Sequence, residues 1–349
     1  MANYNIINTS ALALKSWVQE QNYYAKVPTP KNNQIVYITT DNAIINFNTE
    51  LEVSNDSVVS KYGEEIIAPM VEKIISHEYF ADKEYGIITF NEDVTELNGF
   101  MMQTTLKAIV YPETVTAIGN SALLGCTSLE RFDILPTVTE IKSDAFRDCT
   151  SITSFVIPEN ITEIGSYIFM GCTGLVSVEL NAQIKQLTSS LFRDCTALEN
   201  IQFNTNTIEE ICDQAFGKTN IKKFILPNSI KKLSGFVFAG CQAEEIILNE
   251  GLETMASEVF NNCTNIKRLE FPSSLIMLSS FNLDTCTSLE YLKINSMFSK
   301  NYVNLGRPIK SLKTIEIGEG VTTIPEEYFD THQYVETFIL PNSLKTIES

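Results

Sequence analysis

Cysteine is the residue with reactive chemistry that recurs most regularly in this sequence. The chain of 349 residues contains eight cysteines, and seven of them occupy the same position of a repeat. The seven are Cys126, Cys149, Cys172, Cys195, Cys241, Cys263 and Cys286. Such a column could be a row of buried thiols packed as small hydrophobic groups, a set of disulfides between neighbouring repeats, or a metal site. Burial is favoured, because cysteine is among the most buried residue types and the sequence has no CxxC motif or Cys/His cluster.

Side chains that could support acid–base catalysis are few and scattered. The two histidines, His77 and His332, are far apart in sequence, and His332 lies in a degenerate turn where we expect it to be exposed or capping. Adjacent carboxylates, such as Glu209 and Glu210, fit a solvated surface better than a catalytic pair. The GxSxG, Walker A, GxGxxG and HExxH motifs are absent. The sequence therefore predicts a protein that is not an enzyme and that binds no cofactor or metal.

The cysteines belong to a 23-residue repeat that fills about three quarters of the chain. Four consecutive copies begin at Leu106, Leu129, Ile152 and Leu175. Positions 4 and 6 are apolar, whereas positions 3 and 5 are expected to face outward. This alternation of inward and outward side chains is the period of a β-strand. Proline often follows position 6, where its missing N–H ends the strand. A repeat of this length predicts a solenoid in which each unit is stable only against its neighbours.

The second half of each unit carries an apolar pair at positions 10 and 13 and an apolar–aromatic pair at positions 17 and 18. The pairs Ala145-Phe146 and Leu191-Phe192 are examples of the latter. We expect this half to form a short helical or 3-10 turn on the outer wall, with one phenylalanine per unit stacked into a spine.

Three units depart from the pattern. The unit from Leu198 is shifted by one residue and lacks the cysteine, and the unit from Ala243 follows a one-residue shortening. The unit from Leu289 loses its wall pattern, and Gly306-Arg307-Pro308 suggests a protruding loop that is either a tolerated irregularity or a contact site. The last copy of the repeat stops before its unit is complete, so we expect either more chain or a partner to cover that end.

The N-terminal part of the chain does not follow the repeat. We expect residues 1–84 to form a cap with a helix over about 10–24 and a β-hairpin over about 34–48, whose strands are Gln34–Thr39 and Ala43–Asn48. A shortened repeat begins near residue 85. The predicted organisation is therefore a cap over 1–84 and a solenoid over 85–349, with about ten full units and partial first and last units.

The unit LxxIxIPxxVTxIGxxAFxxCTx resembles the BspA-like leucine-rich repeats of bacterial and protist surface proteins. The resemblance covers roughly residues 85–349, and Pro, Ile-Gly, Ala-Phe and Cys-Thr recur in register. It implies an α/β fold, dominated by β structure: a curved right-handed leucine-rich-repeat solenoid with a parallel sheet on one face and short helical or 3-10 turns on the other. It also implies adhesion to host extracellular-matrix or microbial surface proteins, at the cell surface or outside the cell. The N-terminal residues lack the features of a signal peptide.

The charge of the chain limits its partners. The formal net charge is −18 at pH 7, whereas nucleic-acid binding depends on Lys and Arg that neutralise phosphates. The same acidity disfavours an anionic membrane surface. No apolar run is long enough to span a bilayer. We therefore expect protein ligands, and neither nucleic-acid binding nor membrane insertion.

Outward-facing strand positions are the candidate binding surface, because positions 3 and 5 of successive units line up about 4.8 Å apart in a parallel sheet. The candidates are Arg131, Asp133, Glu179, Gln202, Lys223, Glu245, Arg268, Glu270, Tyr291, Lys293 and Glu316. The best cluster is Arg268, Glu270, Tyr291 and Lys293, since Arg and Tyr are enriched in binding hot spots. The alternative is that these strands carry mixed charge only for solubility. Two roles fit the surface: an adhesion protein, or a structural or receptor-binding appendage subunit such as a phage virion fibre or tail component.

Overall fold

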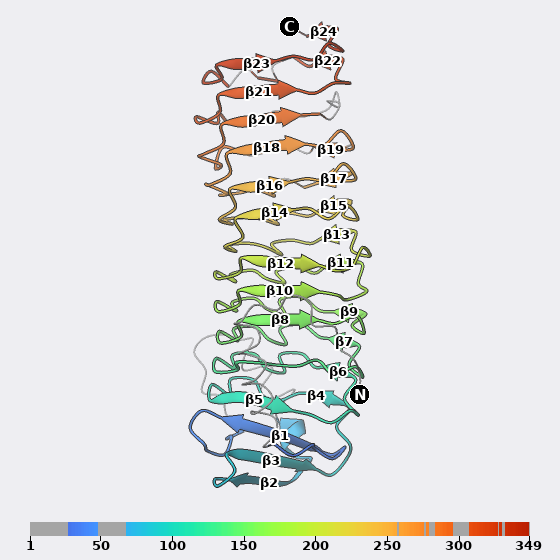
Figure 1. The fold of residues 1–349 in the computed structure, drawn as a ribbon, viewed down its shortest axis with the longest axis vertical. Helices are drawn as coiled ribbons and strands as arrows, with labels where there is room; N and C mark the ends of the chain where they lie inside the picture. The colour runs from blue at the N-terminus through green and yellow to red at the C-terminus, as the bar shows by residue number, and fades with distance from the viewer. Residues whose placement is uncertain are drawn as a thin grey trace, which may run out of the picture.

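The computed structural model describes residues 27–47, 68–256, 258–275, 277–278, 283–295, 307–326, 328–329 and 332–348. The helix expected over about 10–24 and residue 306 of the expected loop lie outside these residues. The described chain forms a tall column of stacked turns, here called rungs, with the N-terminal strands at one end and the C-terminal strands at the other (Figure 1). The predicted solenoid is confirmed.

One side of the column is built from the strands predicted at positions 3 to 6. They pair in parallel, and equivalent residues of successive units are register partners, such as Phe155 with Val178 and Val178 with Ile201. Two sheets result, one of three strands and one of six. The first contains β8 (Ser154–Ile157), β10 (Ser177–Leu180) and β12 (Asn200–Phe203). The second contains β14 (Lys223–Ile225), β16 (Glu245–Ile247), β18 (Arg268–Phe271), β20 (Tyr291–Ile294), β21 (Thr314–Ile317) and β23 (Thr337–Ile339).

A second series of strands, each of two residues, runs up the neighbouring side at positions 12 and 13. These strands form parallel ladders of four, five and two strands. The first is β4 (Glu96–Leu97), β6 (Ala117–Ile118), β7 (Glu140–Ile141) and β9 (Glu163–Ile164). The second is β11 (Gln186–Leu187), β13 (Glu210–Ile211), β15 (Lys232–Leu233), β17 (Thr254–Met255) and β19 (Met277–Leu278), and the third is β22 (Thr323–Ile324) with β24 (Thr346–Ile347).

The outer wall is not helical, which corrects the expected helical or 3-10 turns. Within the described residues the one helix is α3 (Ala68–Val71), which lies outside the full repeats. Alternate N–H groups of the wall donate to the adjacent rung instead, such as Phe146 N to Ile168 O at 3.0 Å and Phe169 N to Leu191 O at 3.0 Å. A backbone N–H committed to a neighbouring rung cannot close a helical turn within its own rung. The fold is therefore almost entirely β.

Left-handed backbone residues shape this wall. Two occur in a typical rung, at positions 16 and 20, as at Tyr167 (φ 62°) and Gly171 (φ 74°). Position 16 is occupied by residues other than glycine along the wall, and Phe236 (φ 57°) is the bulkiest together with Tyr167. L-residues adopt this conformation at a cost of about 1–2 kcal/mol each, so the stacked rungs impose it.

The phenylalanines of position 18 form the expected spine. The ring of Phe192 lies 5.7 Å from that of Phe169 and 5.7 Å from that of Phe216, at interplanar angles of 10° and 20°. The stack continues through Phe146, Phe238 and Phe260, all buried. Since neighbouring rings stack on one another, the spine joins the six consecutive rungs from that of Phe146 to that of Phe260.

An antiparallel sheet covers the first rung. It is ordered β2 (Ile74–Phe80), β3 (Tyr85–Phe90), β1 (Gln34–Thr39) and β5 (Leu106–Val110). The strand over Gln34–Thr39 is present as predicted, but the hairpin is wrong: Ala43–Phe47 form no strand. The edges of β1 are taken by β3 and β5, with which it pairs antiparallel, so no edge is left for a hairpin partner. The division of the chain at residue 84 stays a prediction.

Candidate functional site

The outward residues of β14 to β21 share one exposed face, as the strand period predicts. Arg268 and Tyr291 are register partners on β18 and β20, and so are Glu270 and Lys293. Lys223 and Glu245 are register partners on β14 and β16. The sheet therefore brings together the cluster selected from the sequence. The role of these residues in binding stays a prediction.

Polar contacts tie this cluster into one network. The guanidinium of Arg268 lies over the ring of Tyr291, 3.7 Å from its centroid, and forms an ion pair of 2.6 Å with Glu270. The hydroxyl of Tyr291 donates a hydrogen bond to Glu316, and Lys293 Nζ lies 2.7 Å from the other oxygen of the same carboxylate. The cation–π contact and the shared carboxylate hold both aromatic and cationic groups in place.

The network shifts the ionisation of its members. The hydrogen bonds from Lys293 and then Tyr291 hold the pKa of Glu316 below its usual value. Burial, followed by the hydrogen bond to Glu316, raises the pKa of Tyr291 to about 12. At neutral pH the tyrosine is therefore a neutral donor and the glutamate a charged acceptor.

Four other predicted residues lie away from this network. Glu179 and Gln202 are register partners in the three-stranded sheet, which is separate from the six-stranded one. Arg131 and Asp133 form an ion pair of 3.0 Å but lie on no strand. The reason is the hydroxyl of Tyr111, which donates to Asp133 O and accepts from Leu135 N and so replaces the contacts of a neighbouring strand.

Two isoleucines were missed as part of this face. Ile225 and Ile247 occupy position 5 of β14 and β16, are register partners, and are 61% and 39% exposed. Their neighbours at position 3 are Lys223 and Glu245, whose charged groups lie 2.6 Å apart. We call the two side chains the Ile225–Ile247 patch. The available signal was an apolar residue at a position that the repeat turns to solvent, whereas the predicted binding surface was defined mainly by charged and polar side chains.

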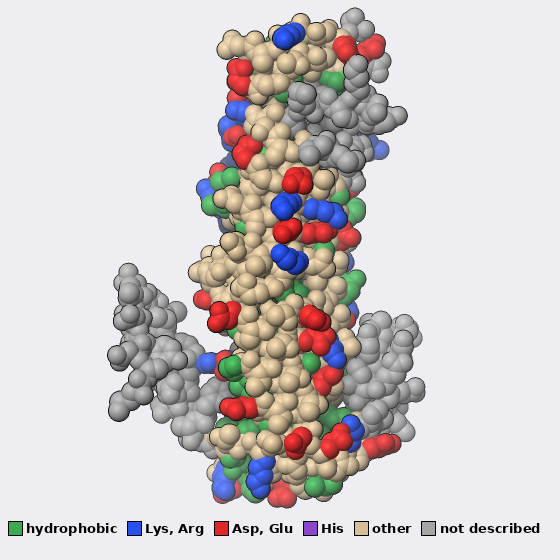
Figure 2. All heavy atoms as spheres, turned by 90° about the vertical axis from the view of Figure 1, so that its right-hand side faces the viewer, with side chains coloured by type: hydrophobic (Ala, Val, Ile, Leu, Met, Phe, Trp, Pro, Cys, Tyr) green, Lys and Arg blue, Asp and Glu red, His purple; other side chains and the backbone are tan. Residues whose placement is uncertain are grey.

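The neighbouring face of short strands has a different character. Figure 2 views this side and shows charged side chains of both signs near its middle, with little hydrophobic surface between them. There Lys231 and Lys232 pair with Glu209 and Glu210 at 3.3 and 2.8 Å. Exposed pairs of this kind contribute about 0–1 kcal/mol. This face is therefore a weaker candidate than the one that carries the Ile225–Ile247 patch.

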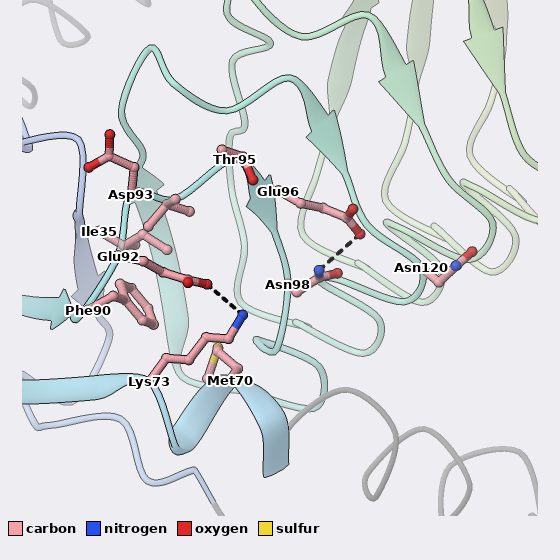
Figure 3. Close-up of a pocket in the computed structure, with 11 residues that line it drawn as sticks. Ile35, Met70, Lys73, Phe90, Glu92, Asp93, Thr95, Glu96, Asn98 and Asn120 are labelled. Atoms are coloured by element: carbon pink, nitrogen blue, oxygen red, sulfur yellow. Dashed lines mark hydrogen bonds and ion pairs between the residues drawn. The ribbon is translucent and has the colours of Figure 1, made fainter.

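A cavity of about 400 Å³ lies at the base of the column, between α3, the end of β3 and β4 (Figure 3). Its polar groups already engage one another: Lys73 pairs with Glu92 at 2.6 Å, and Asn98 donates to Glu96 at 2.9 Å. In the described parts of the chain, no group of three or more His, Cys, Asp or Glu side chains is placed to hold a metal ion. Nor does any described helix have the length and apolar character to cross a membrane.

The cysteine column lies in the core. Its seven members are buried free thiols, and Cys212 outside the column is free and half-buried. Burial raises the pKa of Cys126, Cys149, Cys172 and Cys195 far above the ordinary value. These thiols therefore stay protonated at neutral pH.

His332 was expected to be exposed or capping, and the structure shows it buried, at 5% exposure. It occupies position 21 of its unit, the place of the cysteines, and its carbonyl accepts Val335 N at 3.1 Å as that of Cys286 accepts Leu289 N at 3.0 Å. Burial lowers the pKa of His332. Counting two repeats of 23 residues onward from Cys286 would have revealed this placement.

Comparisons with known proteins agree with this architecture. A family profile described as "BspA type Leucine rich repeat region (6 copies)" matches residues 72–199, 118–243, 191–304 and 231–349. A leucine-rich repeat protein from Bacteroides ovatus ATCC 8483 superposes with a TM-score of 0.53 at 23% identity, over 79% of this chain and 82% of that one. A leucine-rich cell surface protein from Faecalibacterium prausnitzii A2-165 has a TM-score of 0.31 at 20% identity, over 71% of this chain and 77% of that one.

A human protein, volume-regulated anion channel subunit LRRC8B, is 31% identical over 121 residues. That match spans 34% of this chain and 14% of the human protein. The Bacteroides ovatus likeness shows a shared fold.

Proposed function

The chain belongs to the BspA-type leucine-rich repeat family, and on this basis we propose that it is a non-enzymatic protein that binds protein ligands through the exposed sheet of its solenoid. The place of action proposed with it is the cell surface or the extracellular space, and the resemblance to BspA-like surface proteins supports this proposal. The ligands proposed are host extracellular-matrix or microbial surface proteins.

The observation that carries the proposal is the Ile225–Ile247 patch. Two isoleucines side by side, flanked by the charged pair Lys223 and Glu245 and by the charged residues of β18, form an apolar centre with a polar rim, which is the usual anatomy of a protein interface. Covering an exposed isoleucine completely is worth about 1.5–3 kcal/mol. Because both residues are partly covered already, a ligand would gain less than twice that amount from the pair.

The network above the patch supplies the second part of the proposed interface. Arg268 and Tyr291 are residue types enriched in hot spots, and the stacking between them fixes their rotamers before a ligand arrives. Side chains that are held in place lose less entropy on binding. Their charges contribute mainly to orientation and to the rate of association.

Capture from an extracellular-matrix and cell-surface extract tests the proposal. Wild-type chain, the double variant Ile225→Ser/Ile247→Ser and the control variant Val156→Ser are immobilised in parallel at physiological salt. Val156 is an exposed residue of β8 at the same repeat position, but it belongs to the other sheet. We expect one or two proteins retained by wild type and by the control and lost by the double variant. Equal retention by all three, or by none, would count against the proposal.

The proposed location has its own test. Intact cells that produce the protein are treated with an added protease, and the chain is followed by immunoblot beside a known internal protein. We expect digestion of the chain while the internal protein survives. Survival of both would contradict a place at the cell surface, and release into the medium would mean that the protein is secreted.

A further inference from the structure

The thiols of the regular rungs share one hydrogen-bonding pattern. Each donates to the backbone carbonyl of the position-18 residue in the preceding rung. The distances are 3.1 Å for Cys149 to Leu123, 3.0 Å for Cys172 to Phe146, 2.9 Å for Cys195 to Phe169, 3.0 Å for Cys263 to Phe238 and 3.3 Å for Cys286 to Phe260. The same carbonyl also accepts a backbone N–H of its own rung, as Phe146 O accepts Cys149 N at 3.2 Å. Both acceptor sites of the oxygen are then occupied.

Thr219 breaks this pattern. It occupies the cysteine position of the shifted unit and is buried. Its hydroxyl donates to Phe216 O at 3.0 Å, and its backbone N–H contacts the same oxygen at 3.4 Å. By the pattern, Phe216 O is the acceptor for Cys241. With both of its sites taken by Thr219, this oxygen has no place for the Cys241 thiol.

The thiol of Cys241 turns to the next rung instead. Its Sγ lies 3.5 Å from Sγ of Cys263, and both residues are buried. Neighbouring rungs are about 4.8 Å apart, and a disulfide needs a Cα separation of about 4.4–6.8 Å. The general rung spacing lies within that range, and the two sulfurs already face each other at 3.5 Å.

We propose that Cys241 and Cys263 are a disulfide-forming site that links two adjacent rungs of the solenoid. The inference goes beyond the proposed function, which needs no covalent bond between rungs. It concerns this pair alone, because Cys241 is displaced from its carbonyl and faces the thiol of Cys263, whereas Cys149, Cys172, Cys195 and Cys286 follow the regular pattern.

A small-molecule disulfide such as oxidised glutathione is the oxidant in this reaction. One cysteine thiolate attacks a sulfur of the glutathione disulfide, forms a mixed disulfide and expels one glutathione thiolate. The second cysteine thiolate then attacks the protein sulfur of the mixed disulfide and expels the other glutathione thiolate. The two protons lost by the cysteines end on the two glutathione thiolates. Two protein thiols are thus oxidised to one disulfide, and one glutathione disulfide is reduced to two thiols.

Burial determines when this reaction takes place. Since both sulfurs are covered in the folded column, the oxidant reaches them while the rungs assemble or when they open. Refolding in the presence of the oxidant is therefore the appropriate test, and the bond should persist in an oxidising compartment.

The full chain is reduced, unfolded and refolded in a buffer of oxidised and reduced glutathione, and the remaining thiols are alkylated. A protease that cleaves after glutamate separates Cys241 from Cys263, because Glu244, Glu245, Glu250, Glu253 and Glu258 lie between them. We expect mass spectrometry to find one disulfide, between peptides that contain these two cysteines, and alkylation of the other six. Alkylation of all eight cysteines, or a bond between another pair, would overturn the proposal.

Three variants sharpen the test. Cys241→Ser should abolish the cross-linked peptide, and the matched change Cys172→Ser in the regular column should leave its yield unchanged. Thr219→Val removes the competing hydroxyl at nearly constant shape and frees Phe216 O for Cys241, so the yield should fall severalfold. An undiminished yield in Thr219→Val, with the variant folded by circular dichroism, would overturn the assignment of the site to the broken hydrogen-bonding pattern.

Discussion

At the scale of single residues, this fold is maintained by backbone groups that find their partners in the next rung. A carbonyl of the wall accepts one N–H from its own rung and one thiol from the next, as Phe146 O does with Cys149 N and the Cys172 thiol. Because most buried polar groups are paired, a change at one residue alters the partners available one rung away. Thr219 is the example.

The left-handed residues of the wall predict that glycine is tolerated better than alanine at these positions. Phe236 has a φ of 57° and is 40% exposed, so its ring is partly buried and any truncation loses that burial. Glycine removes a backbone cost of about 1–2 kcal/mol and adds about 0.5–1 kcal/mol of chain entropy. We expect the free energy of unfolding of Phe236→Gly to exceed that of Phe236→Ala, which loses the same ring but keeps the strained backbone, by about 0.5–1 kcal/mol, the difference of those two terms. Urea denaturation measures this difference, and Ala239→Gly, in ordinary backbone three residues on, should destabilise the fold.

The carboxylate of Glu316 predicts a pH dependence for the network. Its pKa is lowered by hydrogen bonds from Lys293 and Tyr291, so its contribution to stability is present above the ordinary carboxyl pKa and is lost as pH falls through the lowered value. Wild type should exceed Glu316→Gln in free energy of unfolding at neutral pH, and the difference should shrink towards zero in acid. Denaturation curves across pH test this. A difference that grows as the solution is acidified would refute the network.

At the scale of strands and turns, the sequence was most informative where side chains alternate. The strands at positions 3 to 6 follow from their period of two, and the spine follows from one phenylalanine per unit. The two-residue strands, such as β13, are too short to show alternation. The helical turns expected on the wall were wrong. A backbone N–H can donate to the next rung or within its own rung whatever the residue type, so the sequence does not reveal which acceptor it takes.

In the candidate site too, features that follow from alternation could be predicted, and those that depend on hydrogen-bond direction could not. The outward direction of Arg268 and Tyr291 could be predicted from alternation, and their pairing from the alignment of repeats. The absence of a strand at Arg131 and Asp133 depends on the hydrogen bonds that the Tyr111 hydroxyl makes. That could not be predicted from spacing, and neither could the loss of the hairpin, because the strands that pair with β1 lie far along the chain.

The stacked spine predicts that damage to one rung spreads to its neighbours. Phe192 is fully buried between Phe169 and Phe216. Truncation of such a residue costs about 3–5 kcal/mol. We expect Phe192→Ala to lower the free energy of unfolding by that amount and to raise amide exchange in the rungs that contain Phe169 and Phe216. Exchange confined to the rung of Phe192 would show that the rungs are not coupled through the spine.

At the scale of the whole molecule, the two ends of the column are unlike. An antiparallel sheet covers the first rung, whereas the last described rung exposes residues that other rungs bury. Phe338 at position 4 is 45% exposed, while its equivalent Phe155 is buried. In a solenoid each rung is stabilised by nearest neighbours, so within the chain of residues 1–349 the last described rung, whose side chains are more exposed, should be the least stable.

Stability should therefore rise from the C-terminal rung towards the middle of the column. We expect amides of residues 335–348 to exchange fastest, and those of β10 to β16 slowest, by hydrogen exchange with mass spectrometry. The rung at β5 should exchange more slowly than the C-terminal rung, since β1 covers it. Fastest exchange at β5 would mean that the antiparallel sheet does not protect that end.

The affinity of a captured protein ligand for variants of the sheet face tests the central claim most directly. The dissociation constant is measured for wild type, Ile225→Ala, Ile247→Ala and the control Val156→Ala. Loss of about 1–1.5 kcal/mol of apolar contact at either isoleucine corresponds to roughly tenfold weaker binding, so we expect about that for each single variant and no change for the control. Unchanged affinity in both isoleucine variants would contradict binding through this face.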